Sequence, residues 1–391
     1  MSSIAIVSSF APSEDFGGPA RIFHMRRALE QAGHTVLHVV VSANHLSKGV
    51  RPIDLVQVVE RPFRASIDHM YNDVDLADRA AANPNITRAI TSHLRGHNVS
   101  VVILEQAFLI DMVAKVVDTL GAALVYSCEN IEYRLRADLE RFEYLWKRPL
   151  DRADRVRELE QKAASLATVV TAICPTDQQL LRSEFGVESV LVPNGSSIAD
   201  MPVPVVVSAK RAGEPVDFVM AGSSYWPNLE GFAALATPSL AFLPPTTRIH
   251  IAGSMSTEVL KWRDIERRYS VNASRIVRRG FLDMSELVAT MHAARAVLVP
   301  VFTGEGSNLK SADALACGRP VIMTERATRG YEDVLAEDDE GVTVVSDAAE
   351  FRRAMTAALG GTRSSGSVGA TRRRSLSWSQ RLASLQTATT N

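Results

Sequence analysis

The sequence predicts an α/β protein of two doubly wound units, each with a parallel sheet covered by helices on both faces. Short apolar runs alternate with helical stretches along both halves of the chain, as in parallel sheets. With 391 residues, of which 46% are hydrophobic and 22% charged, the chain is long enough for two cores. Residues 196–215 lose this periodicity and gain Pro, Lys and Gly, so we predict the linker there.

Composition and charge argue against a nucleic-acid-binding, a disulfide-linked or a membrane-spanning protein. A formal net charge of −1 gives no general attraction to nucleic acid or to an anionic membrane. The cysteines Cys128, Cys174 and Cys317 lie far apart beside apolar runs, which favours buried thiols over disulfides or metal ligands. No run approaches the roughly 20 apolar residues of a membrane span, and the first apolar run is too short for a signal peptide. We therefore expect a cytoplasmic protein.

The first half begins with a strand, a glycine-containing loop and a helix. The loop contains Gly17 and Gly18, and the helix is predicted from Arg21 to Gln31. The G-x-G-x-x-G spacing is missing, so no dinucleotide site is predicted. The two glycines either form a turn or let a ligand approach the backbone closely. Strands of this half are predicted at residues 3–7, 35–41, 100–104, 122–126, 168–173 and 190–192.

A polar cluster around Glu129 follows the strand predicted at 122–126. Open α/β sheets bind ligands beyond the carboxyl ends of their strands, so Glu129 is either a functional group or a capping residue of the loop. The stretch 132–164 is predicted to be helical with a charged, solvated face. Thr176 and Gln179 are predicted to form the capping box of the next helix, which Gly186 ends.

The second half repeats the alternation of strands and helices. Its helices include one that opens at Pro227 and one capped by Asp283 and Glu286. Gly222, Ser223 and the loop at 304–310 then fall beyond strand ends, where ligands bind. Strands are predicted at residues 217–220, 248–252, 275–277, 296–299, 320–323 and 342–345.

The stretch 296–324 carries the clearest chemistry. It reads as strand, loop, helix and strand, with Ser307 or Asn308 as the helix cap. Lys310 adds a positive charge to the first turn of this helix, where backbone N–H groups already favour an anion. Glu305 and Asp313 lie on either side, and carboxylates accept hydrogen bonds from pairs of sugar hydroxyls. The pattern indicates a sugar nucleotide; the alternative is a surface loop with a Lys310–Asp313 ion pair.

The same residues carry a resemblance to a known family. Glu305, seven further residues, Asp313 and then Ala-Leu-Ala-Cys-Gly-Arg-Pro-Val resemble the signature of the GT-B retaining glycosyltransferases of family 4, the glycosyl transferases group 1. The signature has a second Glu where this chain has Asp313. The turn at 192–195, the Pro227-Asn228 helix start, the Gly280-Phe281 pair and the terminal helix near Trp378 also resemble this family. The resemblance covers most of the chain and is strongest in the second half.

The resemblance implies two facing Rossmann-like domains (GT-B) with a cleft between them. Residues 1–200 would bind the acceptor and residues 201–370 the nucleotide sugar, while a helix at 371–391 would cross back to the first domain. Such enzymes move a sugar from a nucleoside-diphosphate sugar to a hydroxyl of a sugar, glycolipid or other acceptor, with retention and without a metal or cofactor. UDP or GDP is the expected nucleotide. Bacterial polysaccharide, glycolipid or glycoconjugate synthesis is the expected setting, with possible contact at the inner face of the membrane.

The resemblance also implies roles for single residues. Glu305 would meet the donor sugar, Asp313 the ribose hydroxyls, and Glu129 and Glu305 would be catalytic. Gly17 and Gly18 would close over the diphosphate. The full donor-binding set comprises Gly17, Gly18, Gly222, Ser223, Phe281, Glu305, Gly306, Ser307, Asn308, Leu309, Lys310 and Asp313.

Departures from the family pattern keep alternatives open. Many members carry an Arg and a Lys where residues 222–228 have neither, so Lys310, with Arg278 or Arg279, would bind more of the diphosphate charge. Many members have a His in place of Glu129. A His there would hydrogen-bond the donor sugar, and Glu129 could do the same or could orient an acceptor hydroxyl. The run 372–374 could touch acidic lipid or be a solvated helix start. A sugar-nucleotide epimerase and a catalytically silent sugar-nucleotide-binding subunit are the alternative functions.

Overall fold

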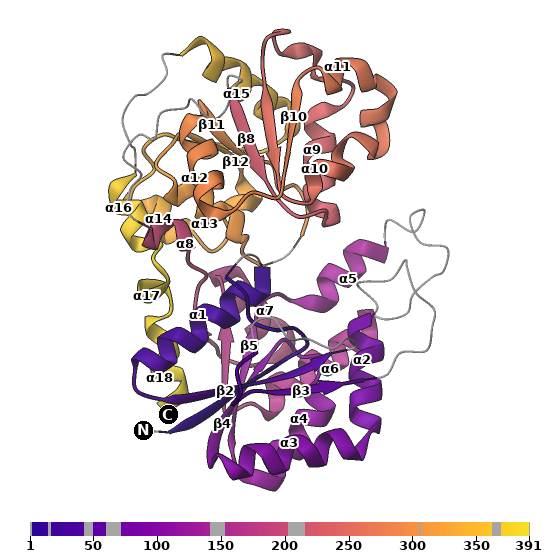
Figure 1. The fold of residues 1–391 in the computed structure, drawn as a ribbon, viewed down its shortest axis with the longest axis vertical. Helices are drawn as coiled ribbons and strands as arrows, with labels where there is room; N and C mark the ends of the chain where they lie inside the picture. The colour runs from indigo at the N-terminus through magenta and orange to yellow at the C-terminus, as the bar shows by residue number, and fades with distance from the viewer. Residues whose placement is uncertain are drawn as a thin grey trace. The chain divides into compact units, whose positions relative to one another are not determined.

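The strands of the chain form two parallel sheets, one in each of two units (Figure 1). The computed structural model describes residues 2–14, 17–42, 50–59, 72–140, 153–201, 216–304, 306–361 and 369–390. Unit 1 comprises Met1–Pro193 and Leu382–Asn391, and unit 2 comprises Asn194–Arg381. The division falls between Pro193 and Asn194, whereas we predicted it after residue 200. Most of the predicted linker, part of the helical stretch 132–164, and Glu305 lie outside the described residues.

Unit 1 contains a seven-stranded sheet with the order β3-β2-β1-β4-β5-β6-β7. The six strands that the sequence predicts are confirmed. The strand β3 was missed because it is a short, half-buried edge strand with a Gln among its residues. The strands are β1 (Ser3–Ser8), β2 (Thr35–Ser42), β3 (Leu55–Val58), β4 (Val99–Glu105), β5 (Ala123–Cys128), β6 (Val169–Ala172) and β7 (Val190–Leu191).

Two helix starts in unit 1 differ from the prediction. Helix α1 begins at Gly17 rather than Arg21, so the two glycines form its first turn. Helix α7 begins at Pro175, and the Sγ of Cys174 accepts the N–H of Asp177 at 3.4 Å, in place of the predicted capping box. Proline suits the first helical position because its missing N–H needs no partner there. The helices are α1 (Gly17–Gln31), α2 (Asn72–Ala82), α3 (Pro84–Gly96), α4 (Ile110–Leu120), α5 (Glu132–Glu140), α6 (Ala153–Leu166), α7 (Pro175–Phe185) and α18 (Ala383–Thr390).

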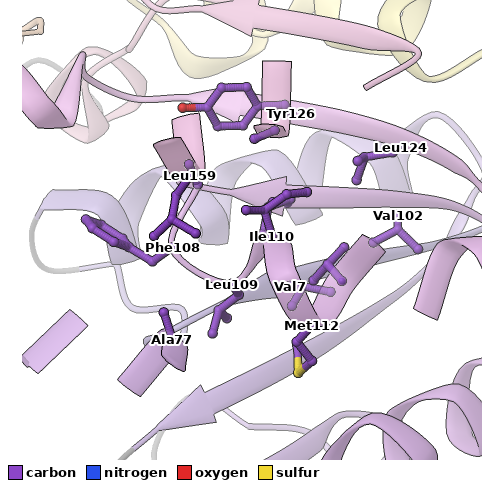
Figure 2. Packing of buried hydrophobic residues seen from close by; sticks show 14 of the residues in the cluster. Val7, Ala77, Val102, Phe108, Leu109, Ile110, Met112, Leu124, Tyr126 and Leu159 are labelled. Atoms are coloured by element: carbon purple, nitrogen blue, oxygen red, sulfur yellow. The ribbon is translucent and has the colours of Figure 1, made fainter. Parts of the chain in front are cut away.

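The core of unit 1 lies between the central strands and the helices that cover them. Figure 2 shows residues of one buried cluster, among them Val102 from β4, Leu124 from β5, Ile110 and Met112 from α4, and Leu159 from α6. Helix α18, from the end of the chain, packs against α1, β6 and β7 (Figure 1). Strands β1 and β4 are buried on both faces, which explains why they read as continuous apolar runs.

Unit 2 contains a six-stranded parallel sheet with the order β10-β9-β8-β11-β12-β13. All six strands predicted for this half are confirmed. In both sheets the first strand lies between the second one and a later one, and the order reverses there: at β1/β4 in unit 1 and at β8/β11 in unit 2. Such switch points open a crevice beyond the strand ends. The strands are β8 (Phe218–Ala221), β9 (Ile249–Ala252), β10 (Ile276–Gly280), β11 (Ala296–Val299), β12 (Val321–Thr324) and β13 (Val342–Val345).

The helices of unit 2 confirm the predicted capping box of Asp283 and Glu286 at the start of α12. The tail predicted as one helix consists of three short helices, of which α16 and α17 belong to unit 2. The helices are α8 (Ser197–Asp200), α9 (Trp226–Ala236), α10 (Met255–Glu258), α11 (Tyr269–Ala273), α12 (Met284–Ala293), α13 (Leu309–Ala316), α14 (Glu332–Glu337), α15 (Ala348–Gly360), α16 (Ala370–Ser375) and α17 (Trp378–Arg381), with 3₁₀ turns at Leu240–Phe242, Val259–Lys261, Arg263–Arg268 and Glu325–Thr328.

The arginines of α16 have structural roles within unit 2. Arg372 is fully buried, and its guanidinium donates to the carbonyl oxygens of Leu315 at 3.0 Å and Asp338 at 3.0 Å. Arg373 donates to the carbonyl oxygen of Ile198 at 2.7 Å. The solvated interpretation of the run 372–374 is therefore wrong for Arg372, and membrane contact stays a prediction.

Three further observations concern the whole of the described chain. All three cysteines are buried thiols, as predicted. Among the described residues, no helix combines the length and the apolar composition that crossing a membrane requires. Within the same ranges, no cluster of three or more His, Cys, Asp or Glu side chains is arranged to hold a metal ion.

Candidate functional site

Lys310 of unit 2 lies where two helices begin beside the switch point. Its Nζ donates a hydrogen bond to the Oδ1 of Asn228 in the first turn of α9. The Nδ2 of Asn228 donates in turn to the carbonyl oxygen of Ser223 at 2.9 Å, which fixes the orientation of the amide. Both segments follow the central strands: residues 222–228 come after β8, and α13 comes after β11. The predicted residues Ser223 and Lys310 are therefore brought together.

The electrostatics around Lys310 favour an anion. The residues that precede these helices, Tyr225 before α9 and Asn308 before α13, do not cap them with their own side chains. Unsatisfied N–H groups at helix starts attract negative charge. Burial lowers the pKa of Lys310 to about 7. Among the described residues, no carboxylate forms an ion pair with this ammonium, so a bound anion would be its counter-charge.

Asp313 is held by the turn that links the two units in sequence. Its carboxylate accepts a hydrogen bond from the Oγ of Ser196 at 2.7 Å. The same Oγ accepts the N–H of Ile198 at 3.1 Å and so caps α8. The Nδ2 of Asn194 donates to the Oγ of Ser307 at 2.9 Å. Burial raises the pKa of Asp313 to about 6, and the hydrogen bond from Ser196 opposes this rise.

The hydrogen bonds of Lys310 and Asp313 bear on the alternative interpretation of this cluster. Lys310 is bonded to Asn228 and Asp313 to Ser196, and both residues are half-buried. The surface loop with a Lys310–Asp313 ion pair is therefore wrong. The loop at 304–308 leads into α13 at Asn308. The carbonyl oxygen of Asn308 accepts a hydrogen bond from the Tyr331 hydroxyl at 3.1 Å, which holds the end of the loop.

The other predicted residues of unit 2 divide into two groups. Gly222, Gly306, Ser307, Asn308 and Leu309 lie in the segments that follow β8 and β11. At Gly222, a Cβ atom would come within 3.1 Å of the Asn228 Nδ2, so a side chain there would press on the partner of Lys310. Phe281, which is 72% exposed, lies past the end of β10 at the edge of the sheet. Arg278 and Arg279 lie on β10 itself, which β9 separates from β8.

In unit 1, Glu129 lies against the first turn of α1. A Cβ atom on Gly18 would come within 3.0 Å of the Oε2 of Glu129 and 2.8 Å of the Cζ of Phe10. The Nε2 of Gln106 donates to the Oε2 of Glu129 at 3.0 Å. Gly17 opens α1 with a φ of 54°, a left-handed conformation that suits glycine, so the turn and the close approach of a ligand both stay predictions. Burial raises the pKa of Glu129 well above its ordinary range, and the neighbouring Glu105 adds to this effect.

Sequence reasoning missed several residues that hold these groups. Asn228 and Asn194 were quoted only for their likeness to family motifs, and Ser196 was placed in the linker. Glu105 and Gln106 follow the predicted strand at 100–104 directly. Their position beyond the carboxyl end of a strand was a usable signal, the same one that drew attention to Glu129.

Comparison with known proteins agrees with this arrangement. The family model described as Glycosyl transferases group 1 matches residues 215–360. The chain carries a group 1 glycosyltransferase domain. The matched segment contains the Asn228, Lys310 and Asp313 side chains described above. No curated protein matches the glycosyltransferase by sequence.

Solved structures that resemble the glycosyltransferase cover its whole length. Sucrose-phosphate synthase from Thermosynechococcus elongatus has a TM-score of 0.73 at 16% identity, covering 99% of this chain and 98% of that one. HepE from Anabaena in complex with UDP-glucose has a TM-score of 0.66 at 14% identity, covering 99% of both chains. The catalytic domain of starch synthase IV from Arabidopsis thaliana, bound to ADP and acarbose, scores 0.65 at 13% identity and covers 100% of this chain and 98% of that one. The predicted GT-B resemblance and α/β fold are confirmed.

Proposed function

We propose that the glycosyltransferase moves a sugar from a nucleoside-diphosphate sugar to an acceptor hydroxyl, with retention and without a metal. The observation that carries this proposal is the half-buried Lys310 in the first turn of α13, bonded to Asn228 in the first turn of α9. Negative charge develops on the diphosphate as it leaves the sugar. An ammonium and two helix N-termini, already in place before the reaction, would stabilise that charge.

Asp313 supports a nucleotide sugar over a simple phosphate ester. Its pKa of about 6 leaves it ionised at neutral pH, so its oxygens could accept hydrogen bonds from the two ribose hydroxyls. Ser196 would hold the carboxylate in position through its 2.7 Å hydrogen bond. Glu305 is proposed to meet the donor sugar.

The proposal also names the nucleotide of the donor and the class of acceptor. HepE was solved with UDP and with UDP-glucose, and starch synthase IV with ADP. For this chain we propose UDP or GDP, with the acceptor hydroxyl on a sugar, a glycolipid or another glycoconjugate. A cytoplasmic setting in bacterial polysaccharide or glycolipid synthesis, with membrane contact at its inner face, belongs to the same proposal.

The first test is substitution of Lys310. Removing one preorganised electrostatic partner of a transition state costs about 10²–10³ in kcat, so Lys310→Ala should lose activity on that scale. Because the pKa of free Lys310 is about 7, wild-type donor affinity should fall about tenfold per pH unit above it. The measurement is a steady-state pH series. The donor is chosen beforehand by thermal shift with uridine, guanosine, adenosine and thymidine diphosphates and their sugars.

A matched control is Lys261→Ala, since Lys261 is an exposed lysine of the same unit that pairs with Glu258 three residues before it. It should leave turnover unchanged. Turnover at the wild-type rate in Lys310→Ala would contradict the proposal. Product formed from donor without acceptor would indicate the epimerase instead. Donor binding with no turnover at all would indicate the silent binding subunit.

A further inference from the structure

The first and last residues of unit 2, Asn194 and Arg381, are bonded to each other. The Nε of Arg381 donates to the carbonyl oxygen of Asn194 at 3.1 Å, and its Nη2 donates to the carbonyl oxygen of Gly330. Its Nη1 forms an ion pair with the exposed carboxylate of Asp333 at 2.6 Å, and the guanidinium carbon lies 5.8 Å from the ring centre of Tyr331. Arg381 is 6% exposed, so all three nitrogen atoms of a largely buried guanidinium have partners.

Two of these partners also bond to the segment that leads into α13. The Nδ2 of Asn194 donates to the Oγ of Ser307 at 2.9 Å, and the hydroxyl of Tyr331 donates to the carbonyl oxygen of Asn308 at 3.1 Å. Asn194 and Tyr331 are both buried. One guanidinium therefore supports two side chains that hold consecutive residues of the segment 306–309, which we call the donor segment.

The turn 194–196 is packed directly on α17, the helix that Arg381 ends. The N–H of Ser196 donates to the carbonyl oxygen of Leu376 at 2.9 Å, shortly before this helix. A Cβ atom on Gly195 would come within 2.9 Å of the Cα of Trp378, so the turn and the helix are too close for a side chain there. The guanidinium thus bonds to a turn that α17 already fixes.

The donor segment has little local structure to set its conformation. Gly306 has a φ of 71°, in a region where glycine is one of several conformations it can adopt at low cost. Asn308 precedes α13 without capping it with its own side chain. The conformation of the segment therefore depends on tertiary bonds, among them those from Asn194 and Tyr331.

We propose that Arg381 is a positioning residue of the donor site. It acts through Asn194 and Tyr331, and it holds Ser307 and Asn308 in the conformation that receives the donor. The inference rests on the proposed function, in which the start of α13 and the residues before it bind the sugar nucleotide. A segment that is ordered beforehand binds its ligand without a further loss of conformational entropy, so Arg381 strengthens donor binding without touching the donor.

The first variant is Arg381→Lys, which keeps the charge but loses the planar fork. One nitrogen atom does not span the acceptors that the guanidinium reaches with three. In the free protein, the NMR order parameters of the backbone N–H groups at 307–309 should fall from about 0.85 toward about 0.6. Donor affinity, measured by calorimetry, should fall about tenfold.

A double-mutant cycle tests whether the two bonds to the donor segment act through Arg381. Asn194→Ala keeps the backbone carbonyl that accepts from Arg381, and Tyr331→Phe keeps the ring beside the guanidinium. Each variant removes its bond to the segment and should weaken donor binding about fivefold. In the Arg381→Lys background each should weaken it less than about twofold, because the segment is already loose there. Equal effects in both backgrounds would overturn the proposal.

The matched control is Arg275→Lys. Arg275 belongs to unit 2 and is 7% exposed, and its guanidinium donates to the carbonyl oxygens of Leu243 at 3.0 Å and Val271 at 3.1 Å, neither of them in the donor segment. This variant should lower the unfolding temperature and leave donor affinity and the order parameters at 307–309 unchanged. If Arg381→Lys likewise lowers only the unfolding temperature, the proposal is wrong.

A milder variant covers the case in which Arg381→Lys does not fold. Asp333→Ala removes the exposed carboxylate that pairs with the guanidinium, and it should lower the same order parameters to a smaller extent. Order parameters at wild-type values would then overturn the proposal. Because they are measured without a donor, they test Arg381 separately: absence of sugar-nucleotide binding by the wild type would contradict the proposed function instead.

Discussion

At the scale of single residues, Asp313 combines a cost in stability with a binding role. Burial raises its pKa to about 6, above the ordinary value of 3.8. The folded state therefore holds a proton that the unfolded chain has already released between those values, so stability falls as the pH rises through that window. Above it, the ionised carboxylate destabilises the folded protein. A group that is retained although it lowers the stability of the fold is expected to bind the ligand.

Asp313→Asn should therefore stabilise the protein and weaken donor binding. At neutral pH its unfolding temperature should rise, and in acid, where both side chains are neutral, it should match wild type. Donor affinity should fall because the amide loses one acceptor oxygen. Thermal unfolding across pH and calorimetry with the diphosphate sugar measure the two effects.

Asp283→Asn provides a control of opposite sign. The exposed Asp283 accepts the N–H of Glu286, which lowers its pKa, so its charge should add stability as the pH rises. A pH-independent unfolding difference in Asp313→Asn would contradict the reasoning on burial.

The sequence located the charged residues of the site but not the side chains that hold them. Lys310 and Asp313 were predictable because a helix start beyond a buried strand is a general anion site. Their partners were not, because these are tertiary contacts: Asn228 is 82 residues from Lys310, and Ser196 is 117 residues from Asp313. No local pattern encodes such pairs. Nor did charge alone reveal that Glu105 and Glu129 share a buried location.

At the scale of elements, apolar runs predicted the central strands well because both of their faces are buried. The missed strand β3 lies at the sheet edge, where residues such as Gln57 are only partly covered and the period is lost. The start of α1 was placed too late because glycine is a poor helix former, yet Gly18 is needed where Glu129 approaches. Tertiary packing overrode local propensity at that point.

The position of α9 depends on Gly231. A Cβ on this residue would lie 1.9 Å from the carbonyl oxygen of Pro300, just past the end of β11. Gly231→Ala should therefore push α9 away from the sheet and cost about 1–3 kcal/mol, as overpacking typically does. Because Asn228 lies on the same helix, donor affinity should fall as well. Denaturant unfolding and calorimetry measure both.

Gly360→Ala is the matched control for this helix. Gly360 ends α15, and a Cβ there would meet nothing within 4 Å. Alanine should stabilise that helix by about 0.5–1 kcal/mol. If Gly231→Ala behaved in the same way, α9 would not be held as closely as the contact with Pro300 requires.

At the scale of the whole molecule, the candidate residues lie on two sheets, each of which has one point where the strand order reverses. The alternation of strands and helices in the sequence predicted both sheets. The assignment of the tail was harder. Trp378, Leu382 and Leu385 read as one amphipathic helix, but the chain breaks it into α17 and α18, which belong to different units. Periodicity shows which residues are buried and does not show which core buries them.

Deleting residues 382–391 should therefore loosen unit 1 selectively. Leu382 and Leu385 are each 1% exposed, and burial of each contributes about 1.5–3 kcal/mol. Hydrogen exchange should rise in α1, β6 and β7, which α18 contacts, and stay unchanged in β8 to β13. The control is Thr387→Ala on the same helix, an exposed position that should leave exchange unchanged. Equal exchange increases in both units would contradict the division.

The position of the tail also bears on how the protein is made. Domains generally fold in the order in which they leave the ribosome. Here unit 1 needs α18, which follows the whole of unit 2 in the sequence, and the carbonyl oxygen of Leu315 in α13 needs Arg372 from α16, 57 residues later. Unit 1 therefore cannot complete its packing until unit 2 and then α18 have left the ribosome. A product that stops before residue 370 would lack both partners, so neither unit would be a finished domain.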